Sequence, residues 1–417
     1  MSAVDDDIIF VAMENWDEMW RRNQPIAAEF ARRVPTRKLL YVGLSIDISH
    51  GIRRLSLKPL LRALFRSRKL PTADGYPNIT LFNPVKWLPN TLTFGQRFNR
   101  WRERCQLRRA IKAAGLNSPI LWLNPHYGLH LLGQLSETFV VYDIGDDWSA
   151  IKQAEWLRRQ TIAEDAELCR RADALIVVSE HLRQLKEGLN ARVRRIPNGV
   201  YVDRYTSIAH GTIPSHPATR DWPRPILAYT GTIHAERVDL SLIEDIARAF
   251  PHGTVALIGP NLLDNKDTER LRRHPNIQIT GTFHFNEMPS VMSAFDVCIV
   301  PHAVSPFTES LSPLKLYEYL ASGLPSVATP VPGFRDYPKL VYLADNSEAF
   351  ISAIHDALVE PKHLRALRQA EAQHHSWDAR MDAIESTIIA GRQHRHLCQR
   401  TRSYQSSSSA TTLAPSH

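Results

Sequence analysis

The sequence predicts an α/β protein with two domains, each built around a parallel β-sheet. Three observations carry this prediction. The chain has 417 residues, which is too long for one ordinary hydrophobic core. Short apolar runs without polar alternation recur along both halves, as in strands that are buried on both faces of a parallel sheet. Helical segments lie between most of these runs, as parallel connections require.

The apolar runs fall into two series. The first series comprises residues 8–13, 38–43, 78–84, 119–125, 139–145 and 174–179, and the second comprises residues 226–231, 254–259, 277–281, 297–301, 325–330 and 340–344. A proline-rich segment, 206–225, separates them and is expected to be a linker. The domains are therefore expected at 1–205 and 226–372. From about Cys398 the chain is polar and Ser-rich, so residues 398–417 are predicted to be disordered.

Composition limits the function classes. Hydrophobic residues make up 43% of the chain and charged residues 23%, which is typical of a soluble globular protein. No apolar run is long enough to cross a membrane, and the chain opens with acidic residues at 5–7, so we expect a cytoplasmic protein without a leader. The four cysteines are far apart and form no CxxC pair, which favours a reducing compartment and argues against a metal site.

Basic residues are concentrated in the first half of the chain, and the formal net charge is +8. Residues 52–69 carry seven basic residues, no acid and a leucine stripe at helical spacing. This pattern predicts an interfacial helix on an anionic membrane surface, so the protein is expected to be peripheral on the inner face of the membrane. Phe94, Phe98, Trp101 and Cys105 form a second stripe among arginines. For both stretches, an apolar face on the core with a solvated basic face is the alternative. No motif indicates nucleic-acid binding.

The stretch from 310 to 333 predicts a buried helix followed by a strand. Gly323 and Pro325 end the helix. Lys315 lies in its first turn, where a cation opposes the helix dipole, and Glu318 follows one turn later. A bound phosphate would remove this conflict, and Glu318 could then accept hydrogen bonds from ribose hydroxyls. A surface Lys–Glu pair on a solvated strip is the alternative.

Other chemically capable residues follow predicted strands, where ligands bind in open α/β sheets. Gly231 and Gly259 end two strands of the second half, and Arg237 follows Gly231. Arg237 and Lys315 together could hold a diphosphate without a metal ion. Asp146 and Asp147 follow a strand of the first half and could act as a general base, or could cap the next helix. His126 and His234 also follow strands.

These segments resemble the GT-B glycosyltransferases, close to the large family-4 group and its bacterial polysaccharide and teichuronic-acid-type members. The segments that carry the resemblance are YTGTIHAERVDLSLI, GTFHFNEMPSVMSAFDVCIVPH and SPLKLYEYLASGLPSVATP in the second half, and NWDEMWRRNQPIAAEFARR and YDIGDDWSA in the first. The resemblance implies two Rossmann-like domains facing across a cleft. It also implies that residues 373–397, which include SWDAR, form a helix that crosses back to the first domain.

Site roles follow from the resemblance residue by residue. Lys315 and Arg237 would contact the donor phosphates, Gly231 would let the diphosphate approach, and Glu318 would bind the ribose. The family usually carries a further Glu eight positions before this one, where it touches the donor sugar. Here that position is Ser310, and Glu309 lies one residue away. His126, Glu309 and Ser310 are therefore candidates for contact with a sugar.

The predicted function is transfer of a sugar from a nucleoside-diphosphate sugar to a lipid-linked saccharide acceptor, in assembly of a bacterial exopolysaccharide or lipopolysaccharide. No cofactor and no metal ion are expected. Asp146 or Asp147 would take the acceptor proton if the reaction inverts the sugar configuration. A UDP-sugar 2-epimerase with the same fold, or a non-catalytic nucleotide-sugar-binding protein, are the alternatives.

Overall fold

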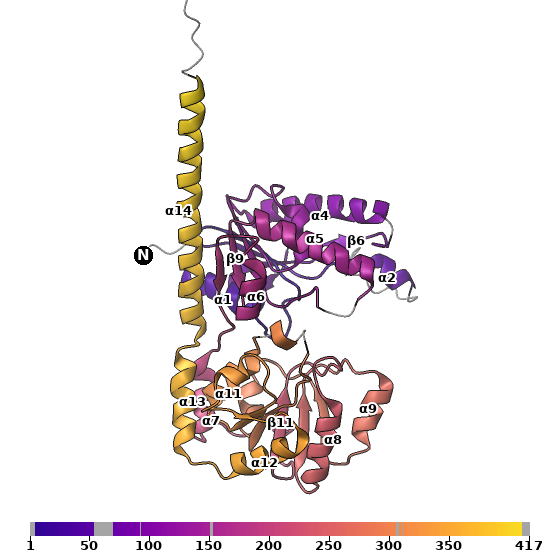
Figure 1. Ribbon diagram of the computed structural model, residues 1–417. Coiled ribbons are helices and arrows are strands. Elements are labelled where there is room, and N and C mark those ends of the chain that lie inside the picture. The colour runs from indigo at the N-terminus through magenta and orange to yellow at the C-terminus, as the bar shows by residue number, and fades with distance from the viewer. Residues whose placement is uncertain are drawn as a thin grey trace, which may run out of the picture.

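Two parallel sheets organise the chain, one in each half (Figure 1). The computed structural model describes residues 5–53, 70–91, 93–150, 153–305, 308–310 and 312–410. The greater part of the predicted lipid-binding helix, residues 54–69, therefore lies outside the described residues. All twelve apolar runs predicted to be strands form strands in these two sheets.

The first sheet has eight strands in the order β10-β9-β8-β7-β1-β2-β5-β4. All neighbours are parallel except β4 and β5. The strands are β1 (Ile8–Val11), β2 (Leu39–Val42), β4 (Thr72–Ala73), β5 (Tyr76–Phe82), β7 (Ile120–Leu123), β8 (Phe139–Ile144), β9 (Ala174–Val177) and β10 (Val193–Arg195). A separate small sheet pairs β3 (Ile46–Asp47) with β6 (Val85–Lys86).

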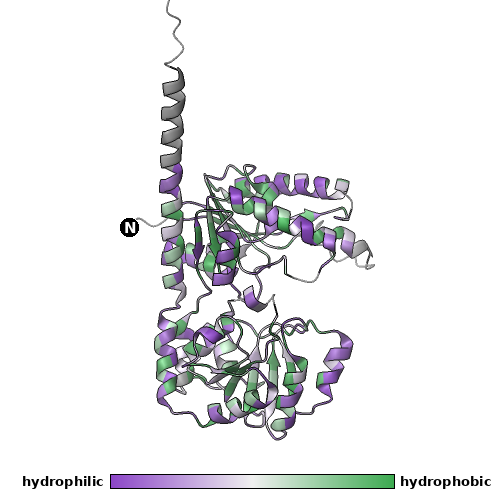
Figure 2. Cartoon of the chain, viewed as in Figure 1, coloured by the Kyte–Doolittle hydropathy of each residue, from purple (hydrophilic) through white to green (hydrophobic). Residues whose placement is uncertain are grey.

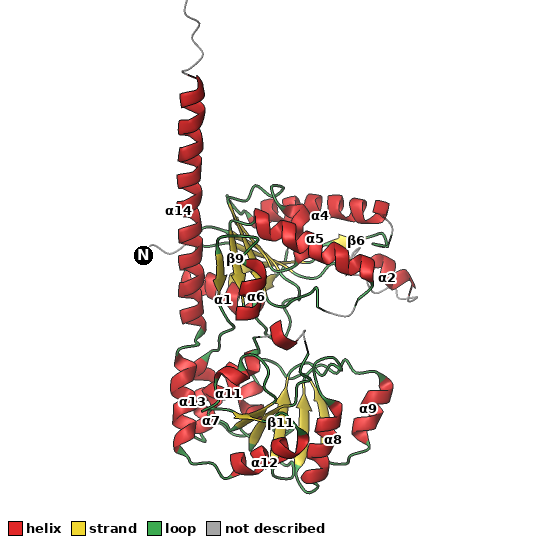
Figure 3. Cartoon of the chain, in the orientation of Figure 1, coloured by secondary structure: helices red, strands yellow, loops and turns green. Residues whose placement is uncertain are grey.

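The second sheet has six parallel strands in the order β13-β12-β11-β14-β15-β16. They are β11 (Ile226–Thr230), β12 (Thr254–Ile258), β13 (Ile277–Gly281), β14 (Val297–Val300), β15 (Ser326–Ala328) and β16 (Tyr342–Leu343). The central strands are buried along their whole length, because helices cover both faces of each sheet (Figures 2 and 3).

Helices connect the strands. In the first half they are α1 (Asn23–Arg33), α2 (Ile48–Arg53), α4 (Thr93–Ala114), the 3₁₀ helix η1 (His126–Leu131), α5 (Glu155–Arg171), α6 (Glu180–Lys186) and α7 (Val202–Ala209). In the second half they are α8 (Leu240–Ala249), α9 (Asn265–Arg272), α10 (Met288–Met292), η2 (Thr308–Ser310), α11 (Leu314–Ser322), η3 (Phe334–Asp336), α12 (Ser347–Leu358), α13 (His363–Gln373) and α14 (Trp377–Ala410).

Helix α14 runs from the second domain along the first (Figure 1). Its residues Met381, Ile384 and Ile388 are buried in the core cluster that contains Phe10 of β1. Arg33 of α1 also forms ion pairs with acidic residues of α14. The C-terminal helix therefore ties the two domains together.

Two predicted boundaries differ from the structure. The segment 206–225 does not begin as a linker, because α7 continues to Ala209. Val202, Tyr205 and Ile208 recur at helical spacing and pack into the core of the second domain, which accounts for the extra turn. The tail also does not become disordered at residue 398, since α14 continues to Ala410. No Gly or Pro between residues 392 and 410 would end the helix there.

The domains also meet through aromatic residues beside the cleft. Trp20 stacks on Phe285 with ring centroids 4.8 Å apart, and the guanidinium of Arg204 lies 3.9 Å from the Phe285 ring. The backbone N–H of Phe285 donates to the carbonyl of Glu18 at 2.9 Å. Trp20 belongs to the first domain and Phe285 to the second, so these contacts hold the two domains facing each other.

Candidate functional site

A cleft of about 600 Å³ lies between the two sheets. Each sheet has one place where the strand order reverses, between β1 and β7 in the first and between β11 and β14 in the second. Connections diverge at such a point, which opens a crevice at the carboxyl ends of the strands. The residues that follow these four strands, Glu14, Asn124, Gly231 and His302, all line the cleft.

Lys315 forms the most distinctive feature of the cleft. It lies in the first turn of α11 and is only 9% exposed. Its Nζ is 3.4 Å from Nε2 of His302 and 3.7 Å from the centroid of the Tyr229 ring. Burial, together with the nearby Arg237, lowers the pKa of Lys315 well below its usual range. A bound anion would offset both effects, as the sequence predicts for this position.

Glycines make room for this lysine. Gly231 has a φ of 131°, and a Cβ at this position would lie 3.0 Å from Nζ of Lys315. Gly259 has a φ of 142°, and its Cβ would collide with the carbonyl oxygen of Gly231. Side chains are therefore excluded from both strand ends, and the backbone of this loop is open to a close ligand.

Glu318 lines the same cleft one turn after Lys315. The Tyr205 hydroxyl donates to its Oε1 at 3.0 Å, which fixes the carboxylate. Burial raises the pKa of Glu318, and the Tyr205 hydrogen bond and Lys315 oppose that rise. Arg237 also lines the cleft, so all four residues predicted to bind the donor lie together.

Two of the first-domain carboxylates that line the cleft have a raised pKa. Asp146 follows β8 and lines the cleft, and burial raises its pKa to about 6 against the lowering effect of Arg237. Glu14 follows β1, and burial raises its pKa to about 7. Asn23 Nδ2 donates to Glu14 Oε1 at 2.8 Å and to Asn124 Oδ1 at 3.1 Å, which holds the Glu14 side chain in place.

Asp147 does not line the cleft among the described residues. Its Oδ1 accepts hydrogen bonds from the backbone N–H of Ser149 at 3.0 Å and from its hydroxyl at 2.6 Å. This is the local turn-capping role that the sequence left open for one of the two aspartates.

The three residues predicted to contact a sugar lie elsewhere. Glu309 forms an ion pair with Arg335 at 2.8 Å, and Ser310 is fully buried, with its Oγ accepting from the Asp147 N–H at 3.3 Å. Neither is among the described residues that line the cleft, and both lie in the short helix η2. His126 lines a different cavity of the first domain. Nδ1 of His234 accepts a hydrogen bond from the backbone N–H of Glu236 at 3.2 Å.

Glu14, Asn124 and His302 are site residues that the sequence-based prediction missed. The signal that could have found them is similar to the one that located Gly231, a polar or small residue at the carboxyl end of a predicted strand. No group of three or more His, Cys, Asp or Glu residues is arranged to hold a metal ion in the part of the chain that the structure describes. None of the helices among the described residues is both long and apolar enough to cross a membrane.

Comparison with known proteins connects this geometry to an enzyme class. The profile of the family described as "Glycosyl transferases group 1" matches residues 224–360, which include all four residues predicted to bind the donor. The "Putative teichuronic acid biosynthesis glycosyltransferase TuaH" of Bacillus subtilis is 26% identical over 346 residues, which cover 78% of this chain and 81% of that protein.

Solved structures share the fold. Sucrose-phosphate synthase from Thermosynechococcus elongatus superposes with a TM-score of 0.65 at 16% identity, over 95% of this chain and all of that chain. Anabaena HepE in complex with UDP-glucose superposes with a TM-score of 0.60 at 14% identity, over 92% of this chain and 99% of that chain. These similarities extend over both domains and the cleft between them.

Proposed function

We propose that this chain, which is a glycosyltransferase with the GT-B fold, moves a sugar from a nucleoside-diphosphate sugar to a hydroxyl of a saccharide acceptor. The observation that carries the proposal is the buried Lys315, which shares the cleft with Arg237 and the open backbone of Gly231. Two cations beside a backbone without a side chain suit a diphosphate. The UDP and UDP-glucose complexes of HepE lend support, because that protein has the same fold.

The reaction places negative charge on the leaving diphosphate. Lys315 and Arg237 would stabilise that charge as the bond to the sugar breaks, so no metal ion or other cofactor is part of this proposal. Glu318, fixed by Tyr205, would accept hydrogen bonds from the ribose hydroxyls. On the opposite side of the cleft, Asp146 would receive the acceptor proton if the configuration inverts, or position sugars if it is retained.

A lipid-linked acceptor used in bacterial polysaccharide assembly is part of the same proposal, with the protein on the inner face of the membrane. The name of the Bacillus relative supports a polysaccharide role. Helix α4 supports contact with lipid, because Phe94 is 73% exposed and Trp101 is 53% exposed among arginines, whereas Leu107 faces the core. Aromatic side chains beside cations suit an anionic membrane surface.

The test is incubation with a panel of radiolabelled nucleotide sugars and a bacterial membrane extract. Label that becomes lipid-soluble supports the proposal. A changed soluble sugar without transfer would instead identify an epimerase, and binding without conversion would identify a nucleotide-sugar-binding protein. Flotation with liposomes, with and without anionic lipid, tests the membrane contact separately, and binding that does not respond to salt would contradict it.

We expect nucleotide binding to take up a proton. The pKa of Lys315 is lowered in the free protein, and a bound diphosphate would raise it again. Between these two pKa values the complex holds a proton that the free protein lacks, so affinity for UDP should fall as pH rises. Calorimetry at mildly alkaline pH, in two buffers of different ionisation enthalpy, measures this uptake. Lys315→Met should abolish it, and equal heats for the wild type in both buffers would contradict the prediction.

Replacing Glu318 should weaken nucleotide binding specifically. Hydrogen bonds to a charged group contribute about 1.5–3 kcal/mol, so we expect Glu318→Gln to weaken UDP binding roughly 10- to 100-fold. Glu309→Gln is the matched control, because Glu309 is paired with Arg335 outside the cleft. Isothermal calorimetry of both variants checks the assignment, and equal losses in the two variants would count against it.

A further inference from the structure

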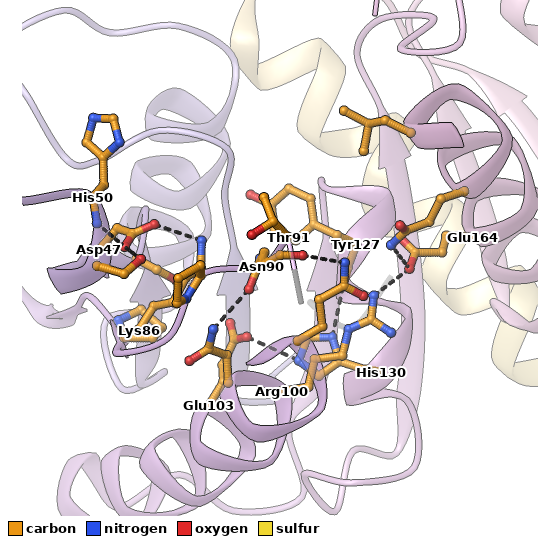
Figure 4. A pocket seen from close by; sticks show the side chains of 18 of the residues that line it. Asp47, His50, Lys86, Asn90, Thr91, Arg100, Glu103, Tyr127, His130 and Glu164 are labelled. Carbon is orange, nitrogen blue, oxygen red and sulfur yellow. Dashed lines mark hydrogen bonds and ion pairs between the residues drawn. The ribbon is translucent and has the colours of Figure 1, made fainter. Parts of the chain in front are cut away.

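A second cavity, of about 560 Å³, lies within the first domain (Figure 4). It is bounded by the small sheet β3–β6, by α4, by η1 and by the start of α5. Its volume lies within the range of small-molecule sites, which is about 300–1,000 Å³. The roles proposed above for the donor site use no residue of this cavity.

The charged side chains in the cavity are largely paired with one another. The Glu103 carboxylate lies 3.2 Å from Nε2 of His130, and two ion pairs line the cavity: Asp47 with Lys86 at 2.8 Å and Arg100 with Glu164 at 2.5 Å (Figure 4). Because a countercharge already accompanies each of these ions, an anionic or cationic ligand would gain little from entering. A neutral ligand with many hydroxyls fits better, because carboxylate and guanidinium groups can each take part in further hydrogen bonds.

The remaining polar groups also suit hydroxyls. Asn90, Thr91 and Gln96 line the cavity with amide and hydroxyl groups. Within the described residues, the buried Nδ1 of His126 has no hydrogen-bond partner. Burial lowers the pKa of His126, so that the neutral ring can both donate and accept a hydrogen bond.

Aromatic rings complete the lining. Trp156 of α5 is 58% exposed and Tyr127 of η1 is 40% exposed, and both line the cavity. Exposed aromatic rings next to paired polar groups offer an apolar face together with hydrogen bonds, and a pyranose ring presents the same combination of C–H faces and hydroxyls.

The cavity also lies next to the cleft. Leu44 lines the cleft and its neighbour Ser45 lines the cavity; likewise, Asn124 lines the cleft and His126 lines the cavity. One oligosaccharide could therefore place its reacting unit in the cleft and another unit in the cavity.

We propose that this cavity binds a neutral sugar unit of the acceptor, one that does not itself react. Only the role of the bound sugar as part of the acceptor rests on the proposed function, because saccharide binding itself can be measured without sugar transfer. It implies that the acceptor carries at least two sugar units, and that Trp156 positions it.

The test is saturation-transfer NMR on the full chain with a panel of neutral methyl glycosides, in the presence of saturating UDP. We expect at least one glycoside to receive saturation while UDP occupies the cleft. Trp156→Ala should weaken its binding about 2- to 12-fold, the range for a lost aromatic contact. Leu262→Ala is the control, because Leu262 is similarly exposed, at 61%, but lines neither the cavity nor the cleft.

The outcomes separate the two proposals. Three results would each overturn the saccharide site. They are the absence of saturation transfer to every glycoside, displacement of the glycoside by UDP, and equal glycoside binding by Trp156→Ala and the wild type. Binding of inorganic phosphate that Trp156→Ala weakens, without binding of a glycoside, would overturn it as well. Glycoside binding that Trp156→Ala weakens in a protein that binds no nucleotide would support the cavity site while contradicting the proposed function.

Discussion

Replacing Lys315 with Met should reduce the rate of sugar transfer roughly 100- to 1,000-fold, the usual cost of removing one preorganised group that stabilises transition-state charge. The methionine keeps a long apolar side chain at this position and removes the ammonium group, whose Nζ lies 3.7 Å from the centroid of the Tyr229 ring. Transfer of label from the nucleotide sugar identified in the panel measures the rate.

The fold should tolerate this change. Because burial and Arg237 disfavour the charged form of Lys315, the lysine carries a cost in the free protein that a methionine avoids. We therefore expect an unchanged or slightly higher Tm alongside the lost activity. Lys339→Ala, at an exposed position outside the cleft, serves as the control for a general loss of positive charge. A rate of sugar transfer by Lys315→Met close to that of the wild type would contradict the proposal that this lysine binds the diphosphate.

The sequence was sufficient to single out four residues, Gly231, Arg237, Lys315 and Glu318, that the structure brings together in one cleft. Lys315 stood out because a cation occupied the positive end of a helix, and Glu318 followed at a spacing that places both on one side of that helix. The structure places both in the cleft with Gly231 and Arg237. These assignments depended on local geometry, and local geometry can be predicted from spacing.

The residues that were missed depend on tertiary structure. Glu14, Asn124 and His302 line the cleft because their strands flank the points where strand order reverses. The sequence shows that they stand at strand ends, but it does not show which strand ends meet. Glu309 was placed near the sugar because it stands close to the expected position in sequence. Glu309 is instead paired with Arg335, 26 residues later, and neither residue lines the cleft. No local sequence pattern predicts this contact.

The largest effect on stability should come from Arg22→Ala, in the segment between β1 and α1. The Arg22 guanidinium binds the Asp143 carboxylate through Nε and Nη2 at distances of 2.9–3.1 Å. The two side chains are only 8% and 0% exposed. Removing one partner of a buried pair leaves an uncompensated charge, which costs about 3–5 kcal/mol. For a domain of this size we expect Tm to fall by roughly 6–20 °C.

The neighbouring Arg21 provides the control. Its ion pair with Asp17 is 3.4 Å long, and both side chains are over one-third exposed. Such a pair contributes about 0–1 kcal/mol, so Arg21→Ala should leave Tm nearly unchanged. Equal shifts for Arg21→Ala and Arg22→Ala would contradict the prediction. Replacing both buried partners, as Arg22→Met with Asp143→Leu, should recover much of the loss, because no unpaired charge remains.

Loss of Arg22 should also affect the second domain, where it should weaken UDP binding. Its Nη1 donates to the carbonyl of Pro197 and to Oδ1 of Asn198, and Asn198 in turn donates through Nδ2 to the carbonyl of Ser312. Ser312 lies two residues before α11, the helix that carries Lys315. Arg22 therefore connects Asp143 of the first domain to the residues just before α11. We expect this link to position α11. The double variant Arg22→Met with Asp143→Leu should then bind UDP more weakly than the wild type, even if its Tm is restored. Calorimetry of UDP binding to that variant separates the effect on positioning from the effect on stability.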